Sequence, residues 1–181
     1  MQRALITSLF VTALLVGWFA PSLQTGDIAA KAGAAQNVEL LETEAKEQRF
    51  AAAKRDAWSA GQALLRRSSD GHFYAKVAVN AQDYRFLVDT GASIVALTGD
   101  DATAMGLYWD ESELRPIGRG ASGTVHGVPT MIPRMELDGF EATNVEAAII
   151  PHGLDVSLLG QSFLSRIDTV SISGDTMTLG D

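Results

Sequence analysis

The sequence predicts an all-β domain with one or two short helices, preceded by a helical stalk and an apolar N-terminal segment. From residue 72 onward, apolar and polar side chains tend to alternate, and turn residues interrupt the pattern at short intervals. Residues 36–67 are instead rich in Ala, Glu, Lys, Arg and Leu and lack proline, a composition typical of helix. Ser68–Gly71 breaks that pattern, so we place the start of the domain at residue 71 and its end at residue 181.

The composition excludes several functional classes. The chain has 181 residues and no cysteine, which rules out disulfides and cysteine-rich zinc sites. The formal net charge is -8, and after Asp70 six Lys or Arg face fifteen Asp or Glu, which argues against nucleic acid as a partner. We interpret the acidic excess as a solvated surface, with a preference for basic substrates as the alternative. The three histidines share no metal-ligand spacing, so we expect no metal and no cofactor.

The N-terminal segment predicts membrane attachment. Residues 4–20 form an apolar run that follows Arg3 and ends with Trp18 and Phe19. This length is at the lower edge of what spans a bilayer, and we expect an uncleaved single-pass anchor over residues 1–23. A cleaved export signal is the alternative. Either would place the domain on the periplasmic side of the inner membrane, with residues 24–70 as linker and helical stalk.

The domain can be divided into elements along the chain. Thr98 is a suitable cap for a short helix that Gly106 ends, and Asp138-Gly139 is a strong hairpin turn. The glycine-rich segment 115–129 predicts a flexible hairpin. The strands expected from the period-two pattern cover residues 72–79, 84–88, 94–97, 130–137, 140–150, 169–172 and 176–179.

Two motifs indicate chemistry. The apolar run Phe86–Val88 leads directly into Asp89-Thr90-Gly91-Ala92-Ser93, which places a carboxylate at the edge of a core, where ionisation costs more. Further along, Leu158-Leu159-Gly160 leads into a short helix ending near Phe163. Taken alone, the first motif has an alternative interpretation as a strand followed by a Thr-Gly turn that Asp89 caps.

Together, the two motifs resemble the retropepsin-like aspartic peptidases, and more narrowly the bacterial, membrane-anchored, single-domain members. The resemblance covers residues 72–179 and implies a single-lobe acid-protease barrel that hydrolyses peptide bonds of envelope proteins. It assigns catalysis to Asp89, Thr90 and Gly91. It assigns substrate binding to the loop, to a hairpin that closes over the substrate and to the second motif: Ala92, Ser93, Gly120, Ala121, Ser122, Gly123, Leu159 and Gly160.

The number of carboxylates predicts a homodimer. Hydrolysis of this type needs two aspartates that share a proton, and the chain has a single Asp-Thr-Gly. Asp89 from two chains would therefore meet on a two-fold axis. Viral members carry arginine after the second glycine, paired with an aspartate, where this chain has Gln161 and Ser93, so that dimer contact is in doubt. The alternative function is a catalytically silent peptide-binding or dimerisation module on the same fold.

Overall fold

The computed structural model describes residues 25–120 and 123–180, and it divides into two compact units at residues 49 and 50. The first unit contains most of helix α2 (Thr25–Ser59), on which Val38, Leu40 and Leu41 are exposed. Within the described ranges, no helix combines the length and apolar character needed to cross a membrane. The anchor expected over residues 1–23 lies outside the described residues.

The stalk prediction is wrong at its C-terminal end. The helix expected over residues 36–67 ends at Ser59. Gly61 then adopts a φ of +79°, which is incompatible with a right-handed α-helix and which glycine adopts readily. Strand β1 (Ala63–Arg66) follows, with Ala63 and Leu65 buried in the core, and pairs antiparallel with β10 (Thr176–Leu179). Helix-favouring composition gives way here because alternate side chains are buried against the core. The β structure therefore includes residues that precede Gly71.

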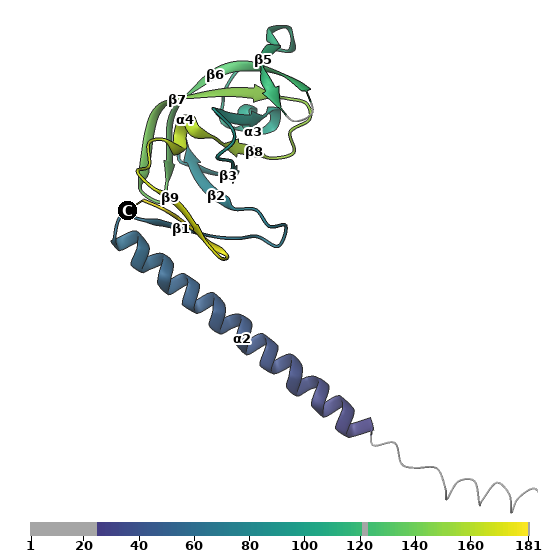
Figure 1. Cartoon of the computed structure of the whole chain (residues 1–181). Helices are drawn as coiled ribbons and strands as arrows, with labels where there is room; N and C mark the ends of the chain where they lie inside the picture. Colours follow the sequence, from purple (N-terminus) through teal and green to yellow (C-terminus); the bar gives the residue numbers. More distant parts are fainter. Residues whose placement is uncertain (1–24, 121–122, 181) are drawn as a thin grey trace, which may run out of the picture. The chain divides into compact units, whose positions relative to one another are not determined.

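The second unit is mostly β (Figure 1). One sheet has three strands in the order β1-β10-β9, and the other has seven in the order β2-β3-β8-β4-β7-β6-β5. A further contact between Ala78 of β2 and Glu136 of β6 brings the larger sheet back onto itself. The remaining strands are β2 (Tyr74–Val79), β3 (Gln82–Val88), β4 (Val95–Thr98), β5 (Arg115–Gly120), β6 (Gly123–Leu137), β7 (Phe140–Ile150), β8 (Ser157–Leu159) and β9 (Val170–Ser173).

The short helices and turns follow the sequence expectations. Helix α3 (Gly99–Ala104) starts where the Thr98 hydroxyl accepts a hydrogen bond from the Asp101 N–H, and helix α4 (Gln161–Leu164) follows Gly160. A short 3₁₀ helix covers Glu111–Glu113. The largest fully buried side chains come from strands of both sheets and from α4, and include Phe86, Phe163, Leu97, Ile132, Met135, Ile149 and Leu179.

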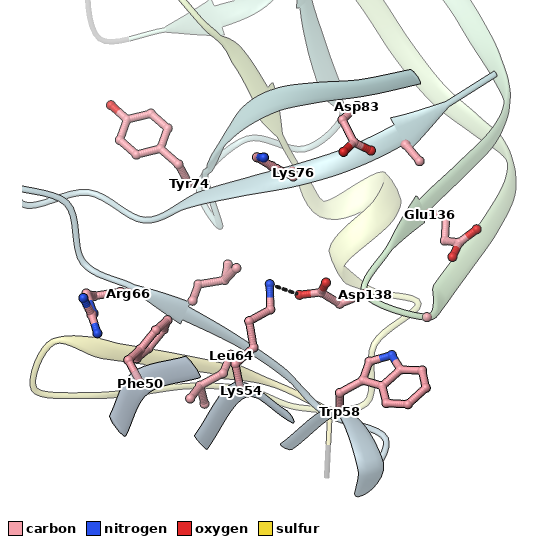
Figure 2. Close-up of a pocket in the computed structure, with 13 residues that line it drawn as sticks. Phe50, Lys54, Trp58, Leu64, Arg66, Tyr74, Lys76, Asp83, Glu136 and Asp138 are labelled. Carbon is pink, nitrogen blue, oxygen red and sulfur yellow. Dashed lines mark ion pairs between the residues drawn. The ribbon is translucent and has the colours of Figure 1, made fainter. Parts of the chain in front are cut away.

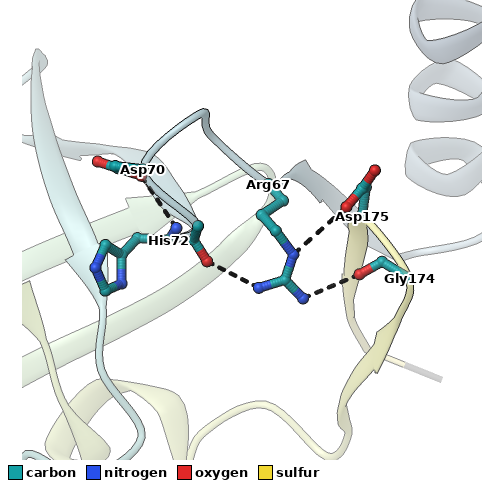
Figure 3. Close-up of polar contacts among 6 residues, drawn as sticks. Arg67, Asp70, His72, Gly174 and Asp175 are labelled. Atoms are coloured by element: carbon teal, nitrogen blue, oxygen red, sulfur yellow. Dashed lines mark hydrogen bonds and ion pairs between the residues drawn. The ribbon is translucent and has the colours of Figure 1, made fainter.

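Arg67 connects the turn at residues 68–71 to the hairpin between β9 and β10 (Figure 3). Its guanidinium donates to the carbonyls of Gly71 at 2.8 Å and Gly174 at 3.0 Å, and lies 3.6 Å from the Asp175 carboxylate. The same group stacks 4.4 Å from the centre of the Phe73 ring. A planar, five-donor side chain suits this arrangement better than lysine would.

The turn beside Arg67 depends on a charged carboxylate. The backbone N–H of His72 and the Tyr74 hydroxyl both donate to Asp70, and these bonds lower the pKa of that carboxyl below its ordinary value of 3.8. Because the folded pKa is lowered, the contribution to stability is present above the unfolded pKa and is lost as pH falls through the folded one. Asp70 is exposed, so the effect on the whole fold is small.

Candidate active site

Strand β3 delivers Asp89 to the middle of the larger sheet. It pairs parallel with the short strand β8, with Val88 opposite Leu159, and the Asp89 N–H continues that ladder by donating to the Leu159 carbonyl at 3.1 Å (Figure 1). The loop therefore starts at the end of β3 and lies beside the end of β8, and both strands are in the interior of the sheet. This placement holds a loop on a rigid support, which is where catalytic groups are usually found.

The loop after Asp89 is a tight turn closed by the carboxylate itself. The Gly91 N–H donates to Asp89 Oδ1 at 2.9 Å, and the Ala92 N–H donates to the Asp89 carbonyl at 3.2 Å. Asp89 is half-buried, whereas Thr90, Gly91 and Ser93 are exposed. The first motif is therefore a closed turn at the end of β3, and the catalytic roles of its residues stay predictions.

The second motif supports this loop through backbone hydrogen bonds. The Gln161 N–H donates to the Ala92 carbonyl at 2.8 Å, and the Ser162 N–H donates to the Ser93 carbonyl at 3.1 Å. A β-carbon on Gly160 would lie 2.1 Å from the Ile94 carbonyl oxygen, so the two backbones approach as closely as only glycine allows. The glycine of the second motif is therefore required by packing under the loop.

Two serines that the sequence analysis missed complete this support. The buried Ser157 hydroxyl accepts from the Thr98 N–H at 3.1 Å and donates to the Asp101 carboxylate. The Ser162 hydroxyl accepts from the Val95 N–H at 3.0 Å and donates to the Glu146 carbonyl at 2.7 Å. Strands β4 and β8 share one residue pair, so the hydroxyls replace backbone bonds that a longer β8 would provide.

Ser162→Ala is expected to lower the free energy of unfolding by about 1–3 kcal/mol, because it leaves the Val95 N–H and the Glu146 carbonyl without the hydroxyl. Urea denaturation of the full chain would measure the change. Ser171→Ala, at an exposed position of β9, is the matched control and should leave the midpoint unchanged. Equal midpoints for the two variants would contradict a bridging role for Ser162.

A cleft of about 550 Å³ opens beside Asp89. Most of the side chains that line it are apolar, with Asp89, Ser93 and Arg119 as the polar ones. The hairpin of β5 and β6 borders it through Gly118 and Gly120. Gly123 pairs with Gly120 across the hairpin, while Ala121 and Ser122 lie outside the described residues. The apolar lining consists of Ala92, Ile94, Ala96, Ile117, Val125, Ile150 and Leu158.

The prediction that Leu159 and Gly160 contact substrate needs correction. Both are buried beneath the loop, and neither lines the cleft. Because side chains alternate along a strand, it is Leu158 of β8 that faces the cleft and Leu159 that faces the core. The motif therefore supports the loop through two residues and meets the cleft through one.

A second hollow of about 470 Å³ continues the cleft along the hairpin and shares Val125, Ile150 and Leu158 with it. His126 and His152 line it, and His152 Nε2 lies 3.3 Å from Glu111 Oε1. In the described part of the chain, no three His, Cys, Asp or Glu side chains are grouped to hold a metal ion. The two hollows are adjacent, because the same three residues line both.

A third hollow of about 620 Å³ lies between residues 50–66 and strands β2 and β6 (Figure 2). Acidic and basic side chains line it together, and Lys54 pairs with Asp138 at 2.9 Å. It contains no residue of the Asp89 loop. Its size does not make it the candidate site, because the carboxylate that follows the end of β6 in its lining, Asp138, is paired with Lys54.

The fold of the second unit is retropepsin-like. Residues 75–166 match the family model of the gag-polyprotein putative aspartyl protease, and the chain belongs to this family. A crystal structure of a retropepsin-like aspartic protease from Rickettsia conorii is similar, with a TM-score of 0.56 and 33% sequence identity. That similarity covers 65% of this chain and 89% of the other.

Two curated relatives have no characterised function. An uncharacterized protein of Rickettsia prowazekii (strain Madrid E) is 35% identical over 124 residues, which are 67% of this chain and 53% of the relative. A protein encoded in the cobV 5′ region of a Sinorhizobium species is 36% identical over 121 residues, which are 65% of this chain and 51% of the relative. The chain thus spans about half the length of the curated relatives it matches.

Proposed function

We propose that this protein is an aspartic endopeptidase that cleaves extended peptides with a pair of Asp89 carboxylates, one from each subunit of a homodimer. The observation that supports it most is the Asp89 loop, fixed on the Gly160 segment at the edge of an apolar cleft. One carboxylate would take a proton from a water molecule. The other, protonated, would donate a hydrogen bond to the scissile carbonyl.

The exposure of the loop supports the homodimer. Thr90, Gly91 and Ser93 are exposed although they surround the carboxylate, so a second subunit has polar backbone and hydroxyl groups to contact there. Two carboxylates brought within about 3 Å cannot both be charged, so their titrations separate into a coupled pair. The pair would then supply the base and the acid at one pH.

The cleft indicates the chemical class of substrate. Its apolar lining suits apolar side chains on either side of the scissile bond, each contributing about 1.5–3 kcal/mol when fully buried. We further propose that the substrates are envelope proteins and that residues 1–23 anchor the chain in the inner membrane. Membrane fractionation, followed by protease digestion of intact and lysed cells, tests this placement, and recovery in the soluble cytoplasmic fraction would overturn it.

The cleavage test uses the full chain and peptides with apolar or charged residues at the central positions. Cleavage of the apolar peptide is expected, and in the dilute range its rate should rise with the square of the protein concentration, because the dimer is the active form. A rate strictly proportional to concentration down to the lowest measurable level would contradict assembly during the assay. Tight binding of the peptide without cleavage would favour the binding module.

A further inference from the structure

Gln161 contacts the Asp89 loop twice. Its backbone N–H donates to the Ala92 carbonyl at 2.8 Å, and its side-chain Nε2 donates to the Thr90 carbonyl at 2.9 Å. Gln161 is the first residue of α4 and follows Gly160, whose close packing fixes where the helix starts. The amide therefore projects from a rigid position onto an exposed loop.

The peptide group between Thr90 and Gly91 is held at both ends. Its oxygen accepts from the Gln161 amide, and its N–H, which belongs to Gly91, donates to Asp89 Oδ1 at 2.9 Å. A peptide group is planar, so fixing its oxygen also fixes the direction of its N–H. The Gln161 side chain thereby acts on the orientation of the Asp89 carboxylate through one rigid group.

Resting on the proposed function, we propose that Gln161 is a positioning residue for catalysis: its amide holds the Thr90–Gly91 peptide so that the Gly91 N–H aligns the Asp89 carboxylate. The clamp is neutral. It needs no charged partner, and it keeps its donor at every pH at which the protein is folded. Gln161 would thus have a role at the position where viral members carry arginine, whose charged contact with an aspartate this chain lacks.

Gln161→Met tests the donor without changing the charge. Methionine has a similar length and no N–H, so the peptide oxygen loses its partner while the backbone bond to Ala92 remains. We expect kcat to fall up to about tenfold, the equivalent of one hydrogen bond, with little change in KM. Because neither residue titrates, the ratio of variant to wild-type activity should not depend on pH.

Gln161→Glu tests the direction of the hydrogen bond. A carboxylate cannot donate to the Thr90 carbonyl, so near pH 7 this variant should lose at least as much activity as Gln161→Met. Below the ordinary glutamate pKa of about 4.3, the protonated carboxyl regains a donor, and the activity ratio to wild type should rise. Gln48→Glu makes the same chemical change at an exposed position of α2 and serves as the control.

Hydrogen–deuterium exchange of the full chain provides a readout without catalysis. Peptides that cover residues 88–93 should exchange faster in Gln161→Met than in wild type, because the Thr90–Gly91 peptide group loses one of its two hydrogen bonds and the Gly91 N–H is less firmly oriented. Unchanged exchange or unchanged kcat in Gln161→Met, or a ratio for Gln161→Glu that stays flat with pH, would overturn the proposal. An inactive wild type would instead refute the proposed function, and the exchange rates alone would then decide whether the clamp exists.

Discussion

Asp89→Asn is expected to abolish peptide cleavage without changing the fold. Asparagine has the same shape and can still accept the Gly91 N–H, so the loop should keep its geometry. It cannot take a proton from water, and it cannot share a proton with a second carboxylate. We expect the rate to fall about 10³-fold or more, measured on the same apolar peptide at equal protein concentration.

Mixing the variant with wild type distinguishes an active site shared between two subunits from an active site contained in one chain. If each site needs Asp89 from two subunits, a ninefold excess of Asp89→Asn should leave about one tenth of the activity per wild-type chain, since most wild-type chains then have a variant partner. Asp168→Asn is the matched control, because Asp168 is exposed and lies outside the loop. It should neither lose activity nor reduce that of wild type. Undiminished activity in the mixture would contradict a site shared between subunits.

The local signals in the sequence were sufficient for most of the second unit. Asp138-Gly139 forms the expected hairpin turn, with φ values of +44° and +97° at its two residues. Thr98 caps its helix, and the short helix expected after Gly160 is present as α4. These features depend on short stretches in which the residue type dictates one backbone conformation.

Long-range packing decided the remaining features. Strand β1 lies in a segment of helix-forming composition, and its pairing with β10 depends on residues more than 100 positions away. Leu158 and Leu159 are identical in type, so the choice of which one faces the cleft follows from the register of β8. Likewise, nothing in the type of Ser157, Ser162 or Gln161 specifies a partner in another strand or loop.

Gly160→Ala is expected to be the most destabilising single-methyl change in this region. The φ and ψ of Gly160 are -95° and -173°, which alanine adopts without strain, so the cost comes from packing alone. A β-carbon would lie 2.1 Å from the Ile94 carbonyl oxygen and 2.8 Å from that of Ala92. Both are backbone atoms, so relief requires the loop and α4 to separate.

That separation would break the bonds from Gln161 to Ala92 and from Ser162 to Ser93, and we expect a loss of about 4 kcal/mol or more in the free energy of unfolding. Gly118→Ala is the control, since a β-carbon there meets open space at an ordinary φ. Thermal and urea unfolding would compare the two variants. If Gly160→Ala fails to fold, Gly160→Ser should fail too, whereas the control stays within about 1 kcal/mol of wild type. A Gly160→Ala protein as stable as the control would show that the loop does not depend on this contact.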